Sequence, residues 1–459
     1  MQSLKTLMCT SCQEPDEMVP SRWMTGIRVF IIIATVAWLG VCPAIAITIN
    51  ETPEISKEIK IPSMGPVVTG TNQNSTVIRI VSDKTCTPSL RYANESHFSV
   101  SQDYDREVFS SSNGTHHAIQ IAGLEPATSY HYFVSGCGIR EMDRTFTTFP
   151  VTGSCTFIVY GDTREQAPLY NQTERHKLVA DRIAQEQDVI FVVNSGDLVS
   201  DSSDPAEWSR FFDATEKVLS VTTYFAVPGN HDANRSLFRQ LFGTDSTTFF
   251  DCGNMRIALL DSTEASSLTL EEQAAWLESA LRPYEGAKVV IMHYPAYSSD
   301  EKHYGGWENI QRTFVPAFQK SGVRLVFNSH VHAFEQVDRN GITYITEARG
   351  GAPAYPLNST RIPGSVRAYE NTLGYSRVNV DPQAGMISID VIRVADVSGD
   401  LRTVTRIYPE GTVDAQIRTP LDRSFTPFPA ILEQICFLKD RKDSSGCRNP
   451  YRIMVSRFF

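Results

Sequence analysis

Residues 156–162 have the sequence Thr-Phe-Ile-Val-Tyr-Gly-Asp, an apolar run typical of a buried strand that ends on the carboxylate of Asp162. Further apolar runs end in the same way, each on a residue type that binds metals. The residues that follow those runs are Asp197, Asn230, His293, and the pair His330 and His332. Because open α/β sheets carry their polar sites where strands end, these side chains are expected to form one cluster.

A single Gly-Asp pair or Asn-His-Asp segment is weak evidence, because both occur in ordinary turns and helix caps. The distribution of histidines strengthens the case. Every histidine after residue 200 falls within or beside these segments, namely His231, His293, His303, His330 and His332. Histidines scattered through a core would not show this distribution. Six oxygen and nitrogen ligands can hold two metal ions, so the sequence predicts a dinuclear site.

The segments resemble, in chain order, the five-block signature of the binuclear metallophosphoesterases, in particular the purple acid phosphatase-like branch: Gly161-Asp162, Gly196-Asp197, Gly229-Asn230-His231-Asp232, His293 and His330-Val331-His332. The resemblance implies an α/β four-layer αββα domain over residues 153–425 and a hydrolase acting on phosphoric ester bonds. It also implies that Asp197 bridges two divalent metal ions. Asp162 and His332 would then complete the first metal site, and the second would be completed by Asn230, His293 and His330.

The chain departs from the family pattern near two of the expected ligands. Ser200 stands where purple acid phosphatases carry a tyrosine that binds ferric iron, so no purple colour is expected. Arg164 stands where other branches have a histidine ligand. The first metal is left with three protein ligands unless Ser200, Asp201 or water adds another. Mixed nitrogen and oxygen ligation without thiolate or phenolate suits Zn²⁺, Mn²⁺ or Fe²⁺.

Further residues near these segments are candidates for proton transfer and phosphate binding. His231 precedes Asp232, whose carboxylate is expected to orient the imidazole toward the leaving-group oxygen. His303 resembles in position the general-acid histidine of purple acid phosphatases, and a solvated loop histidine is the alternative. Arg164 is expected to bind non-bridging phosphate oxygens, and a surface arginine is the alternative. The glycine-rich turn 347–353 resembles one that closes such sites, although packing alone would also explain its glycines.

The chain of 459 residues is long enough for two domains, and its pattern changes near residue 150. Residues 53–148 show short alternating runs separated by turn residues, which indicates an all-β sandwich. The segment Leu124–Tyr132 resembles fibronectin type III-like domains, which precede the catalytic domain in purple acid phosphatases. Packed or solvated side chains are the better interpretation of the three histidines here, His116, His117 and His131.

From Gly153 onward strands alternate with helices. Helix starts are predicted at Asp204–Glu207, which has Asp at the cap and Pro in the first turn, and at Thr269–Glu272, which is a capping box. β-like runs after residue 367 are expected to complete the second sheet. Residues 426–459 form an extension that matches no pattern we can interpret.

Residues 29–49 carry no charge and include Ala44-Ile45-Ala46, which is typical of a secretory signal segment with its cleavage site. An uncleaved membrane anchor and a buried core helix are the alternatives. Residues 1–28 would then be a cytoplasmic segment or the product of a mis-assigned start, since Met24 would begin a shorter signal. The protein is therefore expected to be secreted or anchored at the outer face of the cell membrane.

Six of the nine cysteines follow that segment, and an even number in an exported chain predicts disulfides. The pairs Cys86 with Cys137 and Cys436 with Cys447 are hypotheses based on their places in the sequence. The density of N-glycosylation sequons also suits an exported surface: Asn50, Asn74, Asn94, Asn113, Asn171, Asn234 and Asn358.

The net charge of −10 and the lack of a long Lys/Arg cluster argue against a nucleic-acid-binding surface. The expected partner is a small phosphate ester. Phosphomonoester hydrolysis is the first interpretation, and a phosphodiesterase or nucleotidase is the alternative, because the same metal ligands serve both. A surface binding module with a vestigial metal site is the alternative from a different class. The sequence does not predict the oligomeric state.

Overall fold

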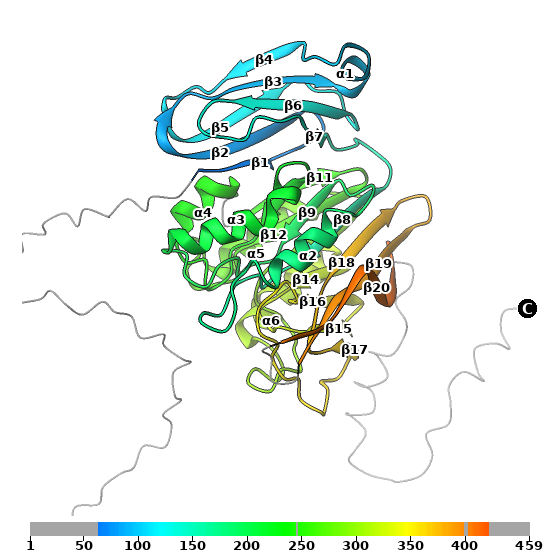
Figure 1. Ribbon diagram of the computed structural model, residues 1–459. Coiled ribbons are helices and arrows are strands. Elements are labelled where there is room, and N and C mark those ends of the chain that lie inside the picture. The colour runs from blue at the N-terminus through cyan, green and yellow to red at the C-terminus, as the bar shows by residue number, and fades with distance from the viewer. Residues whose placement is uncertain (1–62, 245–246, 399–402, 422–459) are drawn as a thin grey trace, which may run out of the picture. The chain divides into compact units, whose positions relative to one another are not determined.

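The computed structural model describes residues 63–244, 247–398 and 403–421 (Figure 1). Within it, residues 64–147 form two antiparallel sheets and a short helix. One sheet has the strand order β1-β2-β5 and the other has the order β4-β3-β6-β7. The bounds of these elements are β1 Met64–Thr69, β2 Ser75–Cys86, β3 Ser89–Asn94, α1 Glu95–Ser101, β4 Arg106–Phe109, β5 Gly114–Ala122, β6 Ser129–Ser135 and β7 Arg144–Thr147.

Both N-terminal sheets bury one face in a shared hydrophobic core. Alternate residues of β5 and β6 point inward, so that Ile119 and Ile121 join Tyr132 and Val134 in one cluster. A disulfide between Cys86 and Cys137 links the end of β2 to the chain that follows β6. This pairing was predicted and is confirmed.

His131 is packed, which is one of the two interpretations expected for the histidines of this region. Its Nδ1 lies 2.7 Å from a carboxylate oxygen of Asp143 and its Nε2 lies 2.8 Å from one of Glu95. The ring also stacks on Phe98 with 4.0 Å between centroids. Burial alone would lower the pKa of His131, but the hydrogen bonds to both carboxylates raise it above its ordinary value.

A pH-dependent contribution to stability follows. A group whose pKa is raised in the folded state stabilises the fold fully at pH values below its unfolded-state pKa. This stabilisation is lost as the pH rises through the folded-state pKa. His131→Gln is therefore expected to lower the melting temperature at pH 5.5 and to have a smaller effect at pH 8.5. Because the carboxylates of Glu95 and Asp143 are partly exposed, the expected loss in the free energy of unfolding at pH 5.5 is about 0.5 kcal/mol. His97→Gln, on the exposed helix α1, is the control, and an equal effect at both pH values would contradict the assignment.

The first sheet of the α/β region has the strand order β10-β9-β8-β18-β19-β20. Strands β8, β9 and β10 run parallel, and β18 pairs antiparallel with β8. The bounds are β8 Cys155–Tyr160, α2 His176–Ile183, β9 Phe191–Asn194, α3 Pro205–Leu219, β10 Thr223–Ala226, α4 Arg235–Phe242, β18 Thr372–Asp381, β19 Met386–Val397 and β20 Val404–Pro420. The β-like runs after residue 367 were expected to complete the second sheet, and this is corrected: they form β18, β19 and β20 of the first sheet, because β18 pairs with β8.

The second sheet has the strand order β11-β12-β13-β14-β16-β15-β17, with β12, β13, β14 and β16 parallel. The bounds are β11 Thr247–Cys252, β12 Met255–Leu260, α5 Leu270–Leu281, β13 Ala287–Ile291, α6 Glu308–Ser321, β14 Leu325–Asn328, β15 Phe334–Arg339, β16 Ile342–Glu347 and β17 Ser365–Tyr369. A disulfide between Cys155 and Cys252, which the sequence did not pair, connects β8 to β11 across the two sheets.

Three hydrophobic clusters set the order of the layers. One cluster lies between the sheets and contains Phe157 from the first and Val289 from the second. Another packs the first sheet against α2, α3 and α4, and a third packs the second sheet against α5 and α6. The predicted mixed α/β fold is confirmed, with the sheets adjacent and helices on their outer faces (Figure 1).

Both predicted helix starts are confirmed. Asp204 caps α3 by accepting a hydrogen bond from the Ala206 amide, and Pro205 occupies the first helical turn. Thr269 and Glu272 form a reciprocal capping box at the start of α5. These caps fix where the helices begin after the loops that leave the strand ends.

Hydrogen bonds join the N-terminal sheets to the elements on either side of Asn230. Thr223, the first residue of β10, donates its hydroxyl to that of Thr71 at 2.6 Å. Arg79 donates to the carbonyl oxygen of Gln240 on α4 at 3.2 Å. Since β10 precedes the Asn230 loop and α4 follows it, both supports of this loop contact the N-terminal sheets.

Several predictions concern segments outside the described residues. These are the signal or anchor segment 29–49, the first 28 residues, the pair Cys436 and Cys447, and the extension 426–459. In the described part of the chain, no helix is long and apolar enough to cross a membrane.

Candidate functional site

The predicted ligand residues come together where parallel strands of both sheets end. Asp162, Asp197 and Asn230 follow β8, β9 and β10 of the first sheet, in that order. From the second sheet, His293 follows β13, and His330 and His332 follow β14. Two neighbouring sheets thus direct their strand ends toward one site, as the sequence pattern predicted.

The second half of the cluster, at the expected second metal, is formed by Asp197, Asn230, His293 and His330. The side-chain oxygen of Asn230 lies 3.1 Å from Nε2 of His293 and 2.9 Å from Nδ1 of His330. His293 Nε2 is also 3.4 Å from Oδ1 of Asp197. Ligand atoms of Asp197, His293 and His330 all lie within 4.8 Å of one another, which is close enough to hold one metal ion.

The first half of the cluster, at the expected first metal, is formed by Asp162, Asp197 and His332. His332 Nε2 lies 3.1 Å from Oδ1 of Asp162, and one ligand atom from each of the three residues lies within 4.8 Å of the others. Asp197 is therefore common to both halves. A carboxylate has two oxygens, so it can contact two cations at once, which is the arrangement that the resemblance implies.

The chemistry of these residues fits a pair of divalent cations. Asp162 and Asp197 are buried carboxylates, and the Oδ1 atom of Asp162 has no hydrogen-bond partner within the described residues. Burial of an unpaired carboxylate is strongly unfavourable unless a cation compensates for it. The backbones of Asp162, Asp197 and His330 also have positive φ angles of 55°, 55° and 71°. Such left-handed conformations in non-glycine residues are concentrated at functional sites.

Backbone carbonyl groups orient two of the imidazoles. Nδ1 of His293 lies 3.0 Å from the carbonyl oxygen of Ser195, and Nδ1 of His332 contacts the carbonyl oxygen of Pro353. A proton on Nδ1 leaves Nε2 as the lone-pair atom that faces the carboxylates. The glycine-rich turn brings Pro353 there, since the amide of Gly350 donates to the carbonyl oxygen of Gly161 at 2.8 Å.

The structure corrects the expected role of Asp232. Nδ1 of His231 lies 2.8 Å from the carbonyl oxygen of Ser200, and this carbonyl rather than Asp232 orients the ring. The buried carboxylate of Asp232 instead accepts hydrogen bonds from the backbone amides of Leu198 and Gly229, at 3.2 and 2.9 Å. Asp232 therefore joins two ligand-bearing loops. Burial and the nearby Asp197 raise the pKa of Asp232 to about 7.

His303 lies beside the second half of the cluster. Its ring centroid is 5.7 Å from that of His330, in an edge-to-face arrangement. Its Nδ1 lies 2.8 Å from the buried carboxylate of Asp300, and Trp307 stacks on its ring at 4.4 Å. A solvated loop histidine would not have these partners. The sequence did not predict the roles of Asp300 and Trp307, although their spacing of three and four residues from His303 is a usable signal.

Arg164 lies on the side of the first half. Its Nε is 3.8 Å from Oδ2 of Asp197, and its side chain is only 13% exposed, so it is not an ordinary surface arginine. Its guanidinium also donates to the hydroxyl of Tyr355 at 3.5 Å. Tyr355 was not predicted as a site residue.

Ser200 and Asp201 do not join the ligand groups. The hydroxyl of Ser200 donates to the carbonyl oxygen of Glu165 at 2.5 Å. Asp201 is exposed, and its carboxylate accepts a hydrogen bond from the amide of Ser203 at 2.8 Å. Neither residue therefore replaces the missing fourth ligand of the first metal.

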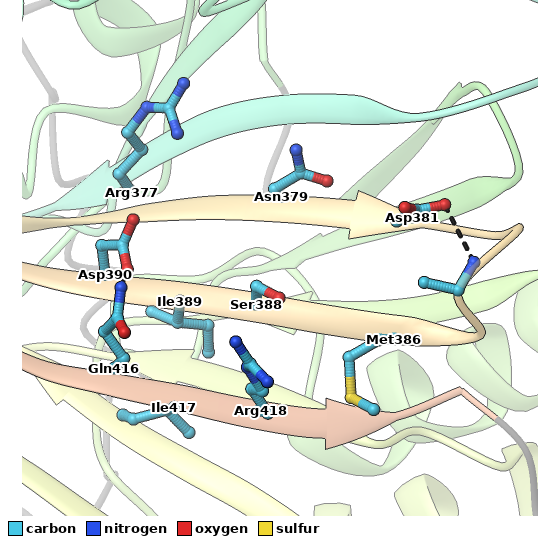
Figure 2. A pocket seen from close by; sticks show the side chains of 11 residues that line it. Arg377, Asn379, Asp381, Met386, Ser388, Ile389, Asp390, Gln416, Ile417 and Arg418 are labelled. Atoms are coloured by element: carbon cyan, nitrogen blue, oxygen red, sulfur yellow. Dashed lines mark hydrogen bonds between the residues drawn. The ribbon is translucent and has the colours of Figure 1, made fainter.

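A separate hollow lies along β18, β19 and β20, beside the turn between β18 and β19 (Figure 2). Its lining includes Arg377, Asn379, Ser388, Asp390 and Arg418, and it contains none of the predicted site residues. It therefore forms no part of the candidate metal centre.

Comparisons with known proteins agree with this geometry. Residues 155–334 match the family model of the calcineurin-like phosphoesterases. Purple acid phosphatase 21 of Arabidopsis thaliana is 25% identical over 313 residues, which cover 58% of this chain and 66% of that protein. A purple acid phosphatase of Glycine max is 28% identical over 267 residues, covering 50% of this chain and 54% of that protein.

Among solved structures, the purple acid phosphatase PPD1 from yellow lupin seeds has a TM-score of 0.62 at 14% identity, covering 77% of this chain and 74% of that one. The structure of PhoD has a TM-score of 0.60 at 12% identity. At these identities the likeness establishes the fold. The chain spans 66% and 54% of the two plant relatives above.

Proposed function

We propose that this chain hydrolyses phosphoric esters at a dinuclear metal centre. The premise is that residues 155–334 form a calcineurin-like phosphoesterase domain of the purple acid phosphatase-like branch. The observation that carries the proposal is the position of Asp197, which belongs to both ligand groups. The proposed ligands are Asp162, Asp197 and His332 for one ion, and Asp197, Asn230, His293 and His330 for the other.

Two divalent cations, when bound here, would supply the positive charge that binds phosphate oxygens and activates a water molecule for attack on phosphorus. The protein's own residues are proposed to orient the ester and to handle its protons. Arg164 would bind a non-bridging oxygen with its planar guanidinium. His303, held by Asp300 and Trp307, would protonate the leaving-group oxygen. His231, in the loop between β10 and α4, would also contact the region of this oxygen.

The proposed substrate is a small phosphomonoester. A phosphodiesterase or nucleotidase with the same centre is the alternative, because the six ligand residues would serve all three activities. Hydrolysis rates with aryl phosphate monoesters and bis-aryl diesters, measured on the same preparation, would separate these activities. A diester rate that exceeds the monoester rate would reverse the assignment.

A surface binding module with a vestigial metal site is the proposal's competitor from another class. All six ligand residue types are present and lie together, whereas a decayed site would be expected to lose ligands first. Metal analysis after purification without chelator provides the test. Substantially less than one metal ion per chain would favour the binding module.

We further propose that residues 53–148 are a fibronectin type III-like sandwich and residues 153–425 the catalytic domain. The two antiparallel sheets with a shared core support the first assignment. The disulfides Cys86–Cys137 and Cys155–Cys252 support an oxidising compartment and hence export, either secreted or anchored through residues 29–49. The sequons at Asn74 and Asn113 lie at exposed positions and are the proposed glycosylation sites.

Removal of the metal should be measurable as a loss of stability as well as of activity. Without cations, the buried carboxylates of Asp162 and Asp197 have ligand atoms within 4.8 Å of each other, and the guanidinium of Arg164, 3.8 Å from Asp197, offsets only part of their charge. Extended chelation is expected to abolish hydrolysis and to lower the free energy of unfolding by about 3 kcal/mol, the value for an ion at ~100 times its dissociation constant. Zn²⁺ or Mn²⁺ should restore both. Full activity after extended chelation would rule out the metal mechanism.

A further inference from the structure

Tyr355 brings a phenol hydroxyl to the first half of the cluster, and three contacts fix its position. Its ring stacks on the imidazole of His332, with 4.0 Å between centroids and 25° between planes. Its backbone amide donates to the carbonyl oxygen of His332 at 3.2 Å. Its hydroxyl oxygen accepts from Nη2 of Arg164 at 3.5 Å. Because the oxygen is the acceptor in this contact, the O–H proton remains free to donate to a ligand.

Arg164 itself has capacity for a further partner. Its Nε is buried and makes no hydrogen bond within the described part of the chain. The nearest carboxylate oxygen, Oδ2 of Asp197, is 3.8 Å away, which is too far for a hydrogen bond. A buried guanidinium nitrogen without an acceptor is unfavourable, so an oxygen from a bound anion would complete this environment.

We propose that Tyr355 completes, with Arg164, a donor pocket for the terminal oxygens of a phosphate dianion, and that this pocket selects phosphomonoesters over diesters. The inference rests on the proposed function and assigns Tyr355 as a substrate-binding residue. The guanidinium offers donors only, and the Tyr355 hydroxyl, which accepts from Arg164, has one proton to donate to the ligand.

The charge and shape of the two ester classes explain the selectivity. A phosphomonoester dianion presents three terminal oxygens and two negative charges, whereas a diester presents two such oxygens and one charge. Hydrogen bonds from donors to a charged oxygen are stronger than those to a neutral ester oxygen. A diester would also have to place its second organic group against the donors, which would then lose their solvent or ligand partners. The pocket therefore favours the monoester.

Tyr355→Phe tests the inference because it removes one oxygen and leaves the ring on His332. Binding is measured by calorimetry on metal-loaded protein, with inorganic phosphate and dimethyl phosphate as the probes. Affinity for inorganic phosphate is expected to fall at least about 10-fold, since a hydrogen bond to a charged group is lost. Affinity for dimethyl phosphate and the metal content should stay within about 2-fold.

Tyr344→Phe is the control, because Tyr344 lies in the core of the second sheet and its hydroxyl has no hydrogen-bond partner within the described residues. It should change neither affinity. Unchanged phosphate binding in Tyr355→Phe, or an equal loss for both probes, would overturn the selectivity assignment. A loss of metal from this variant would show that Tyr355 only supports His332. If the wild-type protein binds metal and hydrolyses esters in these cases, only the inference fails, whereas an inactive wild type would refute the proposed function itself.

Discussion

Replacement of Asp197 by asparagine is expected to remove metal and activity together. Asp197 belongs to both ligand groups, so loss of its charge weakens both ion sites at once. A bridging ligand that fixes two ions contributes several kcal/mol to transition-state stabilisation, and we expect hydrolysis to fall by at least about 10³-fold. Bound metal, measured by mass spectrometry after gel filtration, should fall below one ion per chain.

Asparagine keeps the shape of the aspartate side chain, so the fold should survive the change. The amide of His231 would still find an oxygen acceptor at this position. Asp201→Asn, in the same loop but exposed, is the matched control and should retain metal and activity. Retention of both ions by Asp197→Asn would show that the carboxylate is not a shared ligand.

The strand-end residues could be predicted because a simple physical rule connects them to the fold. An apolar run predicts a buried strand, and parallel strands end at the same edge of their sheet. Asp162, Asp197 and His293 each come within three residues of the end of such a strand, so their proximity in space follows from their positions in the sequence. The spacing of His330 and His332 likewise kept both near the carboxylates.

Residues in irregular loops could not be predicted in this way. The turn that carries Tyr355 approaches Arg164 across 191 positions of the chain, and no periodicity records that contact. Asp232 was assigned to His231 because they are adjacent, but the backbone turns the carboxylate toward the amide of Leu198 in another loop and that of Gly229 in its own loop. Adjacent positions in a loop do not determine where side chains point, whereas the alternation of a strand does.

The disulfide Cys155–Cys252 shows the same limit at the level of the fold. The two cysteines lie on β8 and β11, in different sheets, and are 97 residues apart. Their pairing depends on how the sheets pack face to face. By contrast, Cys86 and Cys137 lie within one small β region, and this common location was enough to pair them.

His303→Ala is expected to separate proton donation from metal binding. The ring of His303 contacts Asp300 through Nδ1, which leaves Nε2 as the atom able to reach a leaving group beside His330. Esters with poor leaving groups, such as alkyl phosphates, should slow by about 10²-fold or more if this imidazole supplies general-acid catalysis. Activated aryl esters should slow much less, because their oxygen departs without a proton. Metal content should be unchanged.

Two further variants define what the imidazole does. Asp300→Asn keeps an acceptor for the backbone amide of His303 but weakens the hydrogen bond to Nδ1 of its ring. It should therefore reproduce part of the rate loss seen with alkyl esters and leave the rate with aryl esters unchanged. Lys302→Ala, at an exposed neighbouring position, should have no effect. If His303→Ala slows both ester classes equally with both metals in place, the residue binds phosphate rather than donating a proton. If neither class slows, His231 becomes the sole donor, because its ring is the other imidazole beside Asp197 that the ligand groups do not use.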